Sequence, residues 1–282
     1  MNIVYLVFGN QLAIHQQANF SILTLLANGG DSFGNIIVIT DAPDYYENIQ
    51  SDKLIVELID DETLTRWKGK YNYIFRAKIK ALDFVINKYP SQSLLYLDSD
   101  TFVVNSLNTI QKQLSENYYL LHVNEGRLSE SRKNTQKSIW KSIKNKTFSS
   151  IKIKPNLCMW NAGIIGIPAQ NNEAYIKLIL ALSDKIYETN IKKKLVEQLS
   201  FSIVLQEQEK FIECEKEIGH YWGNKEEWNA KISSFLLSNH LKNRTFKQEI
   251  AAISSFKLQA LPVVVKKSNT AKRLKQLIDK IF

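Results

Sequence analysis

The amino-acid sequence predicts an α/β fold with a mixed, mostly parallel sheet flanked by helices. Its amino-terminal part alternates short apolar runs with amphipathic segments, which is typical of strand–helix–strand units. With 282 residues, of which 44% are hydrophobic, the chain can bury one large core. We therefore expect a single domain over residues 1–262, followed by a basic, amphipathic helical tail over residues 263–282.

Apolar runs and helically spaced apolar residues divide the chain into expected elements. Strands are predicted at residues 2–8, 36–40, 54–58, 93–97, 118–123 and 159–167. Helices are predicted at residues 14–28, 73–88, 173–187 and 194–206, and most of the chain after residue 223 also has a helical pattern. Residues 126–154 are polar, basic and rich in serine, so we expect a mobile loop with at most one short helix there.

The net charge of +9 favours an anionic partner, whether nucleic acid, an acidic membrane face or a phosphorylated small molecule. The basic residues are concentrated at 133–154 and 266–280. They are not interleaved with aromatic residues, as they are in proteins that bind single strands. We therefore expect no nucleic-acid partner.

Several features of the sequence favour a cytoplasmic protein. The first apolar run has neither a basic stretch before it nor a small-residue cleavage site after it. No apolar run approaches the roughly 20 residues that a bilayer-spanning helix needs. Cys158 and Cys214 lack the spacing of a zinc site or a disulfide framework, so we expect both to be reduced core residues.

The strongest chemical signal is Asp98-Ser99-Asp100, which directly follows the predicted strand at 93–97. Ligands of open α/β sheets bind beyond the carboxyl ends of strands. Two carboxylates two residues apart can bind one hard divalent cation there, and that cation can bridge the two phosphates of a nucleotide diphosphate. The alternative is a loop with two solvated aspartates.

Residues 95–103 resemble the DxD strand of GT-A glycosyltransferases, especially glycosyltransferase family 8, which includes glycogenin and bacterial lipooligosaccharide galactosyltransferases. The resemblance implies a Rossmann-like GT-A fold for nucleotide-diphospho-sugars. It also implies transfer of a hexosyl group from a UDP-sugar to an acceptor hydroxyl with retention of anomeric configuration, in bacterial-type surface glycan synthesis. Asp98 and Asp100 are then ligands of Mn²⁺ or Mg²⁺, and Ser99 lies in the donor site.

A second segment, residues 159–167, resembles the family's FNAGV strand. The resemblance places Asn161, Ala162 and Gly163 against the donor sugar, where an amide side chain can bind sugar hydroxyls. The alternative is a core strand with a glycine bulge.

A third segment, residues 197–202, resembles the family's DQDxxN motif. Gln198 matches the glutamine that lies beneath the anomeric carbon, and Glu197 is a rival candidate for the sugar-facing or basic residue. Leu199 and Ser202 depart from the pattern, which leaves the stereochemistry open. The alternative is an ordinary polar start of a helix.

A fourth segment, residues 220–228, is similar to the family's HxxGxxKPW element. The resemblance makes His220 the third metal ligand, brings Gly223 close to the diphosphate and assigns Lys225 to the phosphate. Lys225 lies one residue early and the proline is missing. The alternative is a structural histidine.

Two further groups of residues are candidates for binding the nucleotide-sugar donor. Phe8 and Gly9 end the first predicted strand, and Thr40 and Asp41 end the second, where such folds receive the base and ribose. An acidic side chain can accept hydrogen bonds from a ribose, although Asp41 is equally suited to cap the turn before Pro43.

Arg76 and Lys80 lie one turn apart near the start of a predicted helix, and they either reach the phosphates or the donor sugar, or form a solvated basic face. Asn124 and Glu125 follow the strand after the metal motif, so we expect them to bind the acceptor. That acceptor is a glycan, a lipid-linked glycan or a protein.

The amphipathic tail either lies on an anionic membrane, giving a peripheral contact at the inner membrane face, or packs on the domain. The functional alternatives are a nucleotidyltransferase, which also places carboxylates at a sheet edge, and an inactive nucleotide-sugar-binding module.

Overall fold

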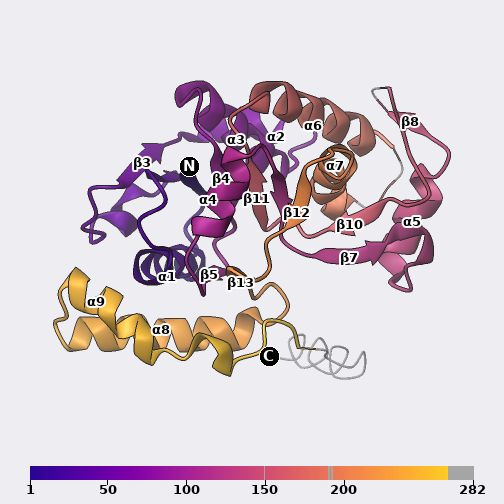
Figure 1. Cartoon of the computed structure of the whole chain (residues 1–282). Coiled ribbons are helices and arrows are strands. Elements are labelled where there is room, and N and C mark those ends of the chain that lie inside the picture. Colours follow the sequence, from indigo (N-terminus) through magenta and orange to yellow (C-terminus); the bar gives the residue numbers. More distant parts are fainter. Residues whose placement is uncertain (149, 190, 192, 266–282) are drawn as a thin grey trace.

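The computed structural model describes residues 1–148, 150–189, 191 and 193–265 and is built around a seven-stranded sheet (Figure 1). The strand order is β12-β6-β11-β4-β1-β2-β3, and only β11 runs antiparallel to its neighbours. The mixed, mostly parallel sheet is therefore confirmed. Its strands are β1 (Asn2–Val7), β2 (Ile36–Thr40), β3 (Leu54–Leu58), β4 (Leu94–Leu97), β6 (Tyr119–Leu121), β11 (Ile164–Ile167) and β12 (Phe211–Glu213).

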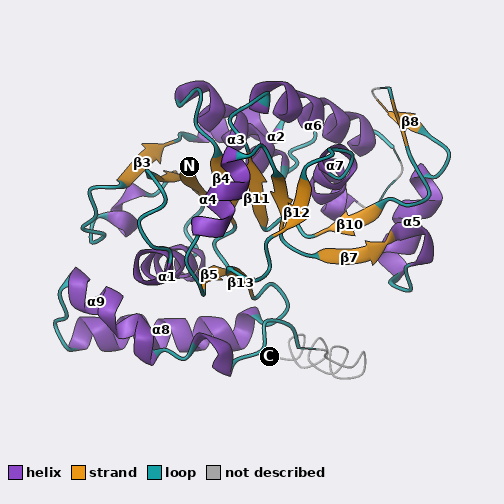
Figure 2. Cartoon of the chain, in the orientation of Figure 1, coloured by secondary structure: helices purple, strands orange, loops and turns teal. Residues whose placement is uncertain are grey.

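Helices cover both faces of this sheet (Figure 2), because successive strand residues point to opposite sides. Val4 of β1 lies in the core on one side, whereas Ile3 and Tyr5 lie in the core on the other. The Val4 side is closed by α2 (Asp61–Lys68), α3 (Arg76–Lys88), α6 (Asn172–Tyr187) and α7 (Val196–Leu205). The opposite side is closed by α1 (Leu12–Asn28), α4 (Asn108–Ser115), α8 (Lys225–Leu241) and α9 (Phe246–Ala252).

A two-stranded ribbon connects the metal motif to the carboxyl-terminal part of the chain. Strand β5 (Thr101–Val103) pairs antiparallel with β13 (Ile218–His220), and His220 lies opposite Thr101. Beyond it, the fully buried Trp228 of α8 stacks on Phe102 and Tyr221, with ring centroids 4.6 and 4.7 Å away. This packing fixes the segment that carries His220.

The prediction of a loop at residues 126–154 is wrong apart from its one short helix, because the segment also forms strands. The structure has β7 (Asn124–Arg127) paired with β10 (Cys158–Trp160), then α5 (Asn134–Ile143) and a hairpin of β8 (Thr147–Phe148) and β9 (Ile151–Lys152). Ile139 and Ile143, one helical turn apart, and Phe148 are buried against the main core. A few well-placed apolar side chains are enough to order this polar segment.

The other expected elements appear with small shifts. The strand expected at 159–167 is two strands, β10 and β11, separated by Asn161, Ala162 and Gly163, and the helix expected from residue 73 begins at Arg76. Short 3₁₀ helices are η1 (Pro43–Tyr46), η2 (Leu128–Glu130), η3 (Lys193–Leu195), η4 (Ile253–Ser255) and η5 (Leu258–Ala260).

The expected helical tail, 263–282, falls almost wholly outside the described residues, which end at Val265. Among the helices that the structure does describe, none has the length and apolar character needed to span a membrane.

Candidate active site

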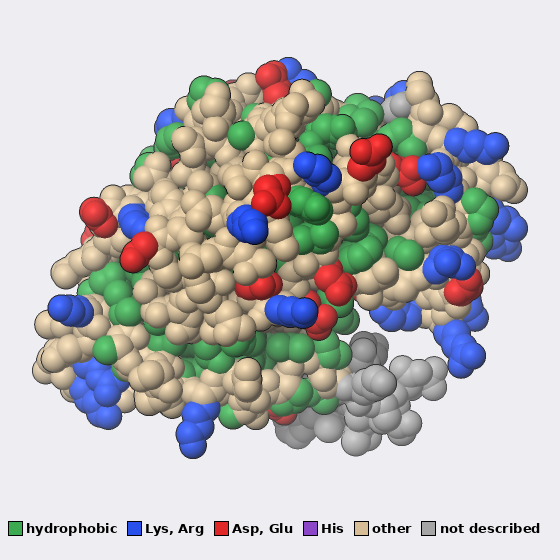
Figure 3. Space-filling model, in the orientation of Figure 1, with side chains coloured by type: hydrophobic (Ala, Val, Ile, Leu, Met, Phe, Trp, Pro, Cys, Tyr) green, Lys and Arg blue, Asp and Glu red, His purple; other side chains and the backbone are tan. Residues whose placement is uncertain are grey.

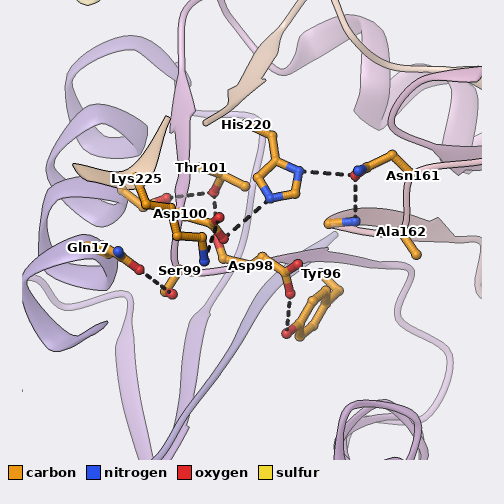
Figure 4. A network of polar contacts seen from close by, with 12 residues as sticks. Gln17, Tyr96, Asp98, Ser99, Asp100, Thr101, Asn161, Ala162, His220 and Lys225 are labelled. Carbon is orange, nitrogen blue, oxygen red and sulfur yellow. Dashed lines mark hydrogen bonds and ion pairs between the residues drawn. The ribbon is translucent and has the colours of Figure 1, made fainter. Parts of the chain in front are cut away.

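Asp98, Asp100 and His220 come together at the carboxyl end of β4. One ligand atom from each lies within 4.8 Å of the other two, and His220 Nε2 is 3.3 Å from Asp100 Oδ1 (Figure 4). The β5–β13 ribbon achieves this approach by bringing residue 220 beside residue 101. The three predicted metal ligands are therefore neighbours.

Hydrogen bonds set the orientation of the His220 ring. The Gly163 N–H donates to Asn161 Oδ1 at 3.0 Å, which identifies that amide atom as an acceptor. The same oxygen lies 3.0 Å from His220 Nδ1, so Nδ1 donates to it, and Nε2 is the ring nitrogen that faces the carboxylates. A neutral imidazole with two carboxylates is a donor set that suits Mn²⁺ or Mg²⁺.

Gly163 is required here by space. A Cβ at this position would lie 2.1 Å from His220 Cε1, so no larger residue fits beneath the ring. The glycine of the predicted Asn-Ala-Gly element thus leaves room for the His220 ring. The backbone carbonyl of Ala162 accepts a hydrogen bond from Lys78 in the same region.

Asp100 is buried and remains anionic because two cationic groups face it. Burial alone would raise the pKa of Asp100, but His220 and the Lys225 ammonium, 2.9 Å from Oδ2, outweigh burial and hold the pKa below its usual range. The Lys225 side chain is half exposed, so it connects the buried carboxylate to the opening of the site.

Lys78, which is not among the residues predicted from the sequence, binds the other aspartate. Its buried ammonium lies 3.0 Å from Asp98 Oδ1 and 3.0 Å from Glu197 Oε1, and it donates to the Ala162 carbonyl. Burial lowers the pKa of Lys78, but the two carboxylates have the larger combined effect and raise it above its usual value. Lys78 therefore carries a fixed positive charge beneath the metal motif.

Arg76 and Lys80, the two predicted donor contacts on this helix, lie away from the cluster. Arg76 donates to both oxygens of Asp184 on α6, at 2.7 and 3.1 Å, and Lys80 pairs with Asp83. Side chains that are two residues apart on a helix point to different faces of it. The structure thus brings Lys78 to the site instead of its two neighbours of like charge.

A cavity of about 550 Å³ opens at the cluster. Lys78, Asp98, Asp100, Glu197 and His220 line one part of it. The remaining wall includes Phe75, Glu125, Lys133, Gln136, Asn161, Gln198, Trp222 and Lys225. Most of the predicted sugar, metal and phosphate residues thus face one space.

Glu125, a predicted acceptor residue, accepts hydrogen bonds from several side chains in this cavity. Its carboxylate accepts hydrogen bonds from Lys133 at 3.3 Å, from Gln136 at 3.1 Å, and from Asn161 and Gln198 at 3.4 Å. Asn124 instead turns back on its own strand, where its Oδ1 accepts from the Gly126 N–H, and it does not line the cavity.

The predicted nucleotide residues form a separate group at the ends of β1 and β2. Both Asp41 oxygens accept from the Gly9 N–H at 3.0 Å, and Thr40 Oγ1 accepts from the Ala42 N–H at 3.1 Å. Phe8 is half-buried beside the Lys68 ammonium. None of these four predicted residues lines the cavity described above.

Ser99 and Gly223, which were also predicted to bind the UDP-sugar, contact other parts of the protein. Ser99 donates to Gln17 Oε1 at 3.1 Å and points away from the carboxylate cluster (Figure 4). Gly223 lies against Val264, because a Cβ at residue 223 would be 2.9 Å from two of that valine's carbons.

The family model described as "Glycosyl transferase family 8" matches residues 45–236, which is more than half of the chain. The chain belongs to this family. An active-site variant of the galactosyltransferase LgtC has a TM-score of 0.50 at 14% identity, over 76% of this chain and 72% of that one. Mouse xyloside xylosyltransferase 1 has the same TM-score at 13% identity, over 76% of this chain and 85% of that one.

These structural likenesses show that this family 8 glycosyltransferase has the GT-A fold, as the sequence predicts. A search of curated proteins found no match. The family model, and not a nucleotidyltransferase model, covers this chain, so the alternative from another enzyme class is not supported.

Proposed function

We propose that this glycosyltransferase is metal-dependent and moves a hexosyl group from a UDP-sugar to an acceptor hydroxyl. The observation that carries the proposal is the convergence of Asp98, Asp100 and His220 within 4.8 Å in the wall of a cavity. These residues would hold Mn²⁺ or Mg²⁺, which supplies charge neutralisation for the departing diphosphate.

Two further charged residues of the site, Lys225 and Lys78, have different proposed roles in binding the UDP-sugar. Lys225, half exposed at the opening, is placed to bind a diphosphate oxygen, where negative charge accumulates as the donor bond breaks. Lys78 keeps Asp98 in position from below. Gly223 beside the diphosphate, Ser99 as a contact of the UDP-sugar and Asp41 as a contact of the nucleotide stay proposals that rest on the sequence.

The chemical step breaks the bond between the anomeric carbon and the diphosphate oxygen and forms a bond to the acceptor oxygen. For transfer with retention, the acceptor proton passes to the departing phosphate oxygen. We assign Gln198 and Asn161, whose amides face the cavity, to the sugar. Glu197 already binds Lys78 with its carboxylate, so we assign it to positioning that lysine.

Leu199 and Ser202, the two residues that depart from the family's DQDxxN motif, pack within the protein and do not replace any residue that lines the cavity. Leu199 is fully buried in the core. Ser202 donates to the Gln198 carbonyl at 2.8 Å and accepts from the Trp160 N–H at 2.9 Å, so it joins α7 to β10. Neither position faces the cavity, which favours an active enzyme over an inactive binding module.

Hydrolysis of the donor without an acceptor tests this function. A panel of UDP- and GDP-sugars is incubated with Mn²⁺ or with a chelator, and nucleotide release is measured for the parent, Asp98→Asn and the matched control Asp31→Asn, which changes an exposed aspartate. We expect metal-dependent release from a UDP-sugar in the parent and the control only. Metal-dependent UDP binding with no release in the parent would establish the inactive module instead.

A further inference from the structure

Residues 131–154, which we call the basic arm, form the most one-sidedly charged region among the described residues. This segment contains α5 and the β8–β9 hairpin and has no acidic residue. Its eight basic residues are Arg132, Lys133, Lys137, Lys141, Lys144, Lys146, Lys152 and Lys154. Figure 3 shows Lys and Arg side chains gathered at the end of the molecule where Figure 1 places α5 and β8.

Most of these charges have no acidic partner in the described part of the chain. Lys133 pairs with Glu125 and Lys154 with Glu207, whereas the other six are exposed and form no ion pair there. Uncompensated like charges repel one another and attract anions. The arm therefore offers a positive surface that the fold itself does not neutralise.

The charges lie on an ordered support. Ile139 and Ile143 of α5 and Phe148 of β8 are buried in the main core. Lys137 and Lys141 lie one turn apart on the exposed side of α5, and the exposed Lys144 caps its carboxyl end, so the three span about 10 Å. A row of cations at fixed spacing suits an extended ligand that carries several negative groups.

The row starts at the rim of the active-site cavity. Lys133, Asn134, Thr135 and Gln136, which precede and form the first turn of α5, line that cavity together with Glu125. A chain whose end lies in the cavity and which leaves past this turn meets the exposed lysines of α5 in sequence.

The chemistry of the arm disfavours a bilayer as the partner. Helices that lie in a membrane interface expose large apolar residues opposite their basic face. The large apolar side chains of the arm are instead buried or partly buried, and none of the exposed large hydrophobic residues falls in the described part of 131–154.

We propose that the acceptor is an anionic glycan, bearing carboxylate or phosphate groups on successive units, whose terminal sugar enters the cavity while its chain lies along the basic arm. This inference rests on the proposed function, because it identifies the acceptor class of the same site.

The test compares two triple variants that remove the same charge. The arm variant is Lys137→Gln with Lys141→Gln and Lys144→Gln. The control is Lys216→Gln with Lys242→Gln and Lys247→Gln, three exposed lysines outside the arm that form no ion pair with a described residue. Binding of a short oligogalacturonate and of a neutral malto-oligosaccharide is measured by calorimetry at low and high salt.

We expect the arm variant to bind oligogalacturonate about tenfold more weakly than the parent, a change of about 1.4 kcal/mol. The control should bind like the parent, and high salt should remove most of the difference. Donor hydrolysis without acceptor should be equal in all three proteins, which shows that the site is intact.

Equal oligogalacturonate affinity in the two triple variants would overturn the inference. So would arm-dependent binding to phosphatidylglycerol-containing vesicles without arm-dependent binding to oligogalacturonate, which would make the arm a membrane contact. If no protein hydrolyses any donor while arm-dependent glycan binding persists, the catalytic proposal fails and anionic-glycan recognition stands.

Discussion

The cavity has two walls that differ in how their side chains are held. The buried wall consists of Lys78, Asp100, His220 and the partly buried Asp98, and its charged groups face one another at 3.0 to 3.3 Å. The open wall consists of Phe75, Lys133 and Trp222, and Trp222 is 44% exposed. Changes in the buried wall should therefore alter stability and chemistry together, whereas changes in the open wall should alter ligand choice alone.

The largest effect is expected when the buried wall loses its lysine. Lys78→Met leaves the Asp98 and Glu197 carboxylates without their shared cation, so we expect the free energy of unfolding to fall by about 3–5 kcal/mol. The matched control, Lys80→Met, removes a partly exposed ion pair with Asp83 and should cost less than about 1 kcal/mol. Urea unfolding of both variants measures the difference, and equal losses would show that the burial of Lys78 does not matter.

A pH effect of nearly the same size is expected from His122, whose ring centroid is 5.6 Å from that of His220. Burial, and then the charge of His220, lower the pKa of His122 from 6.5 to about 4. The unfolded chain therefore binds the proton more readily, and stability is lost as the pH falls from 6.5 toward 4. At the lower end the loss from this group amounts to about 3 kcal/mol.

Unfolding curves of the metal-free protein across this pH range test the assignment. His122→Gln should have a shallower dependence of stability on pH than the parent between pH 6.5 and 4. The pKa of Asp100 is lowered instead, so its contribution is present at neutral pH and is lost only below the usual range of an aspartate. An unchanged slope in His122→Gln would mean that another group titrates in this window.

A smaller effect is expected from Gly163→Ala, which tests how tightly the His220 ring is held. The new Cβ would lie 2.1 Å from His220 Cε1, so the ring must move and lose its bond to Asn161. We expect Mn²⁺ affinity in the presence of UDP to fall about 10- to 100-fold by calorimetry. Gly34→Ala is the control, because its Cβ would come no closer than 3.2 Å to another residue. Unchanged Mn²⁺ affinity in Gly163→Ala would argue against His220 as a ligand.

The two walls also differ in how well the sequence predicts them. Asp98 and Asp100 follow a buried strand, so local pattern was enough to place them at a sheet edge. His220 needed the family resemblance, because a ribbon formed by residues 101–103 and 218–220 brings it there. Lys78 was detectable, since it shares one helical stripe with Ala81, Leu82 and Val85 and a lysine on a buried stripe needs a partner.

The region around the open wall could not be predicted in the same way. The segment from 126 to 154 is polar, and its order depends on Ile139, Ile143 and Phe148 packing against a core made by distant elements. Sparse apolar residues of this kind give a weak local pattern, because their burial is decided by tertiary packing. The exposure of Phe75 and Trp222 at the cavity is likewise a property of the assembled fold.

The smallest effect is expected from Trp222→Ala in the open wall. An exposed aromatic ring at the cavity offers a face on which a sugar ring can stack, and such contacts contribute about 1 kcal/mol. We expect oligogalacturonate to bind about fivefold more weakly. The midpoint of urea unfolding and the rate of donor hydrolysis should stay unchanged, because the side chain is 44% exposed and makes no bond to the metal cluster. Loss of donor hydrolysis in this variant would show that the two walls are coupled, and the division between a buried chemical wall and an open recognition wall would no longer hold.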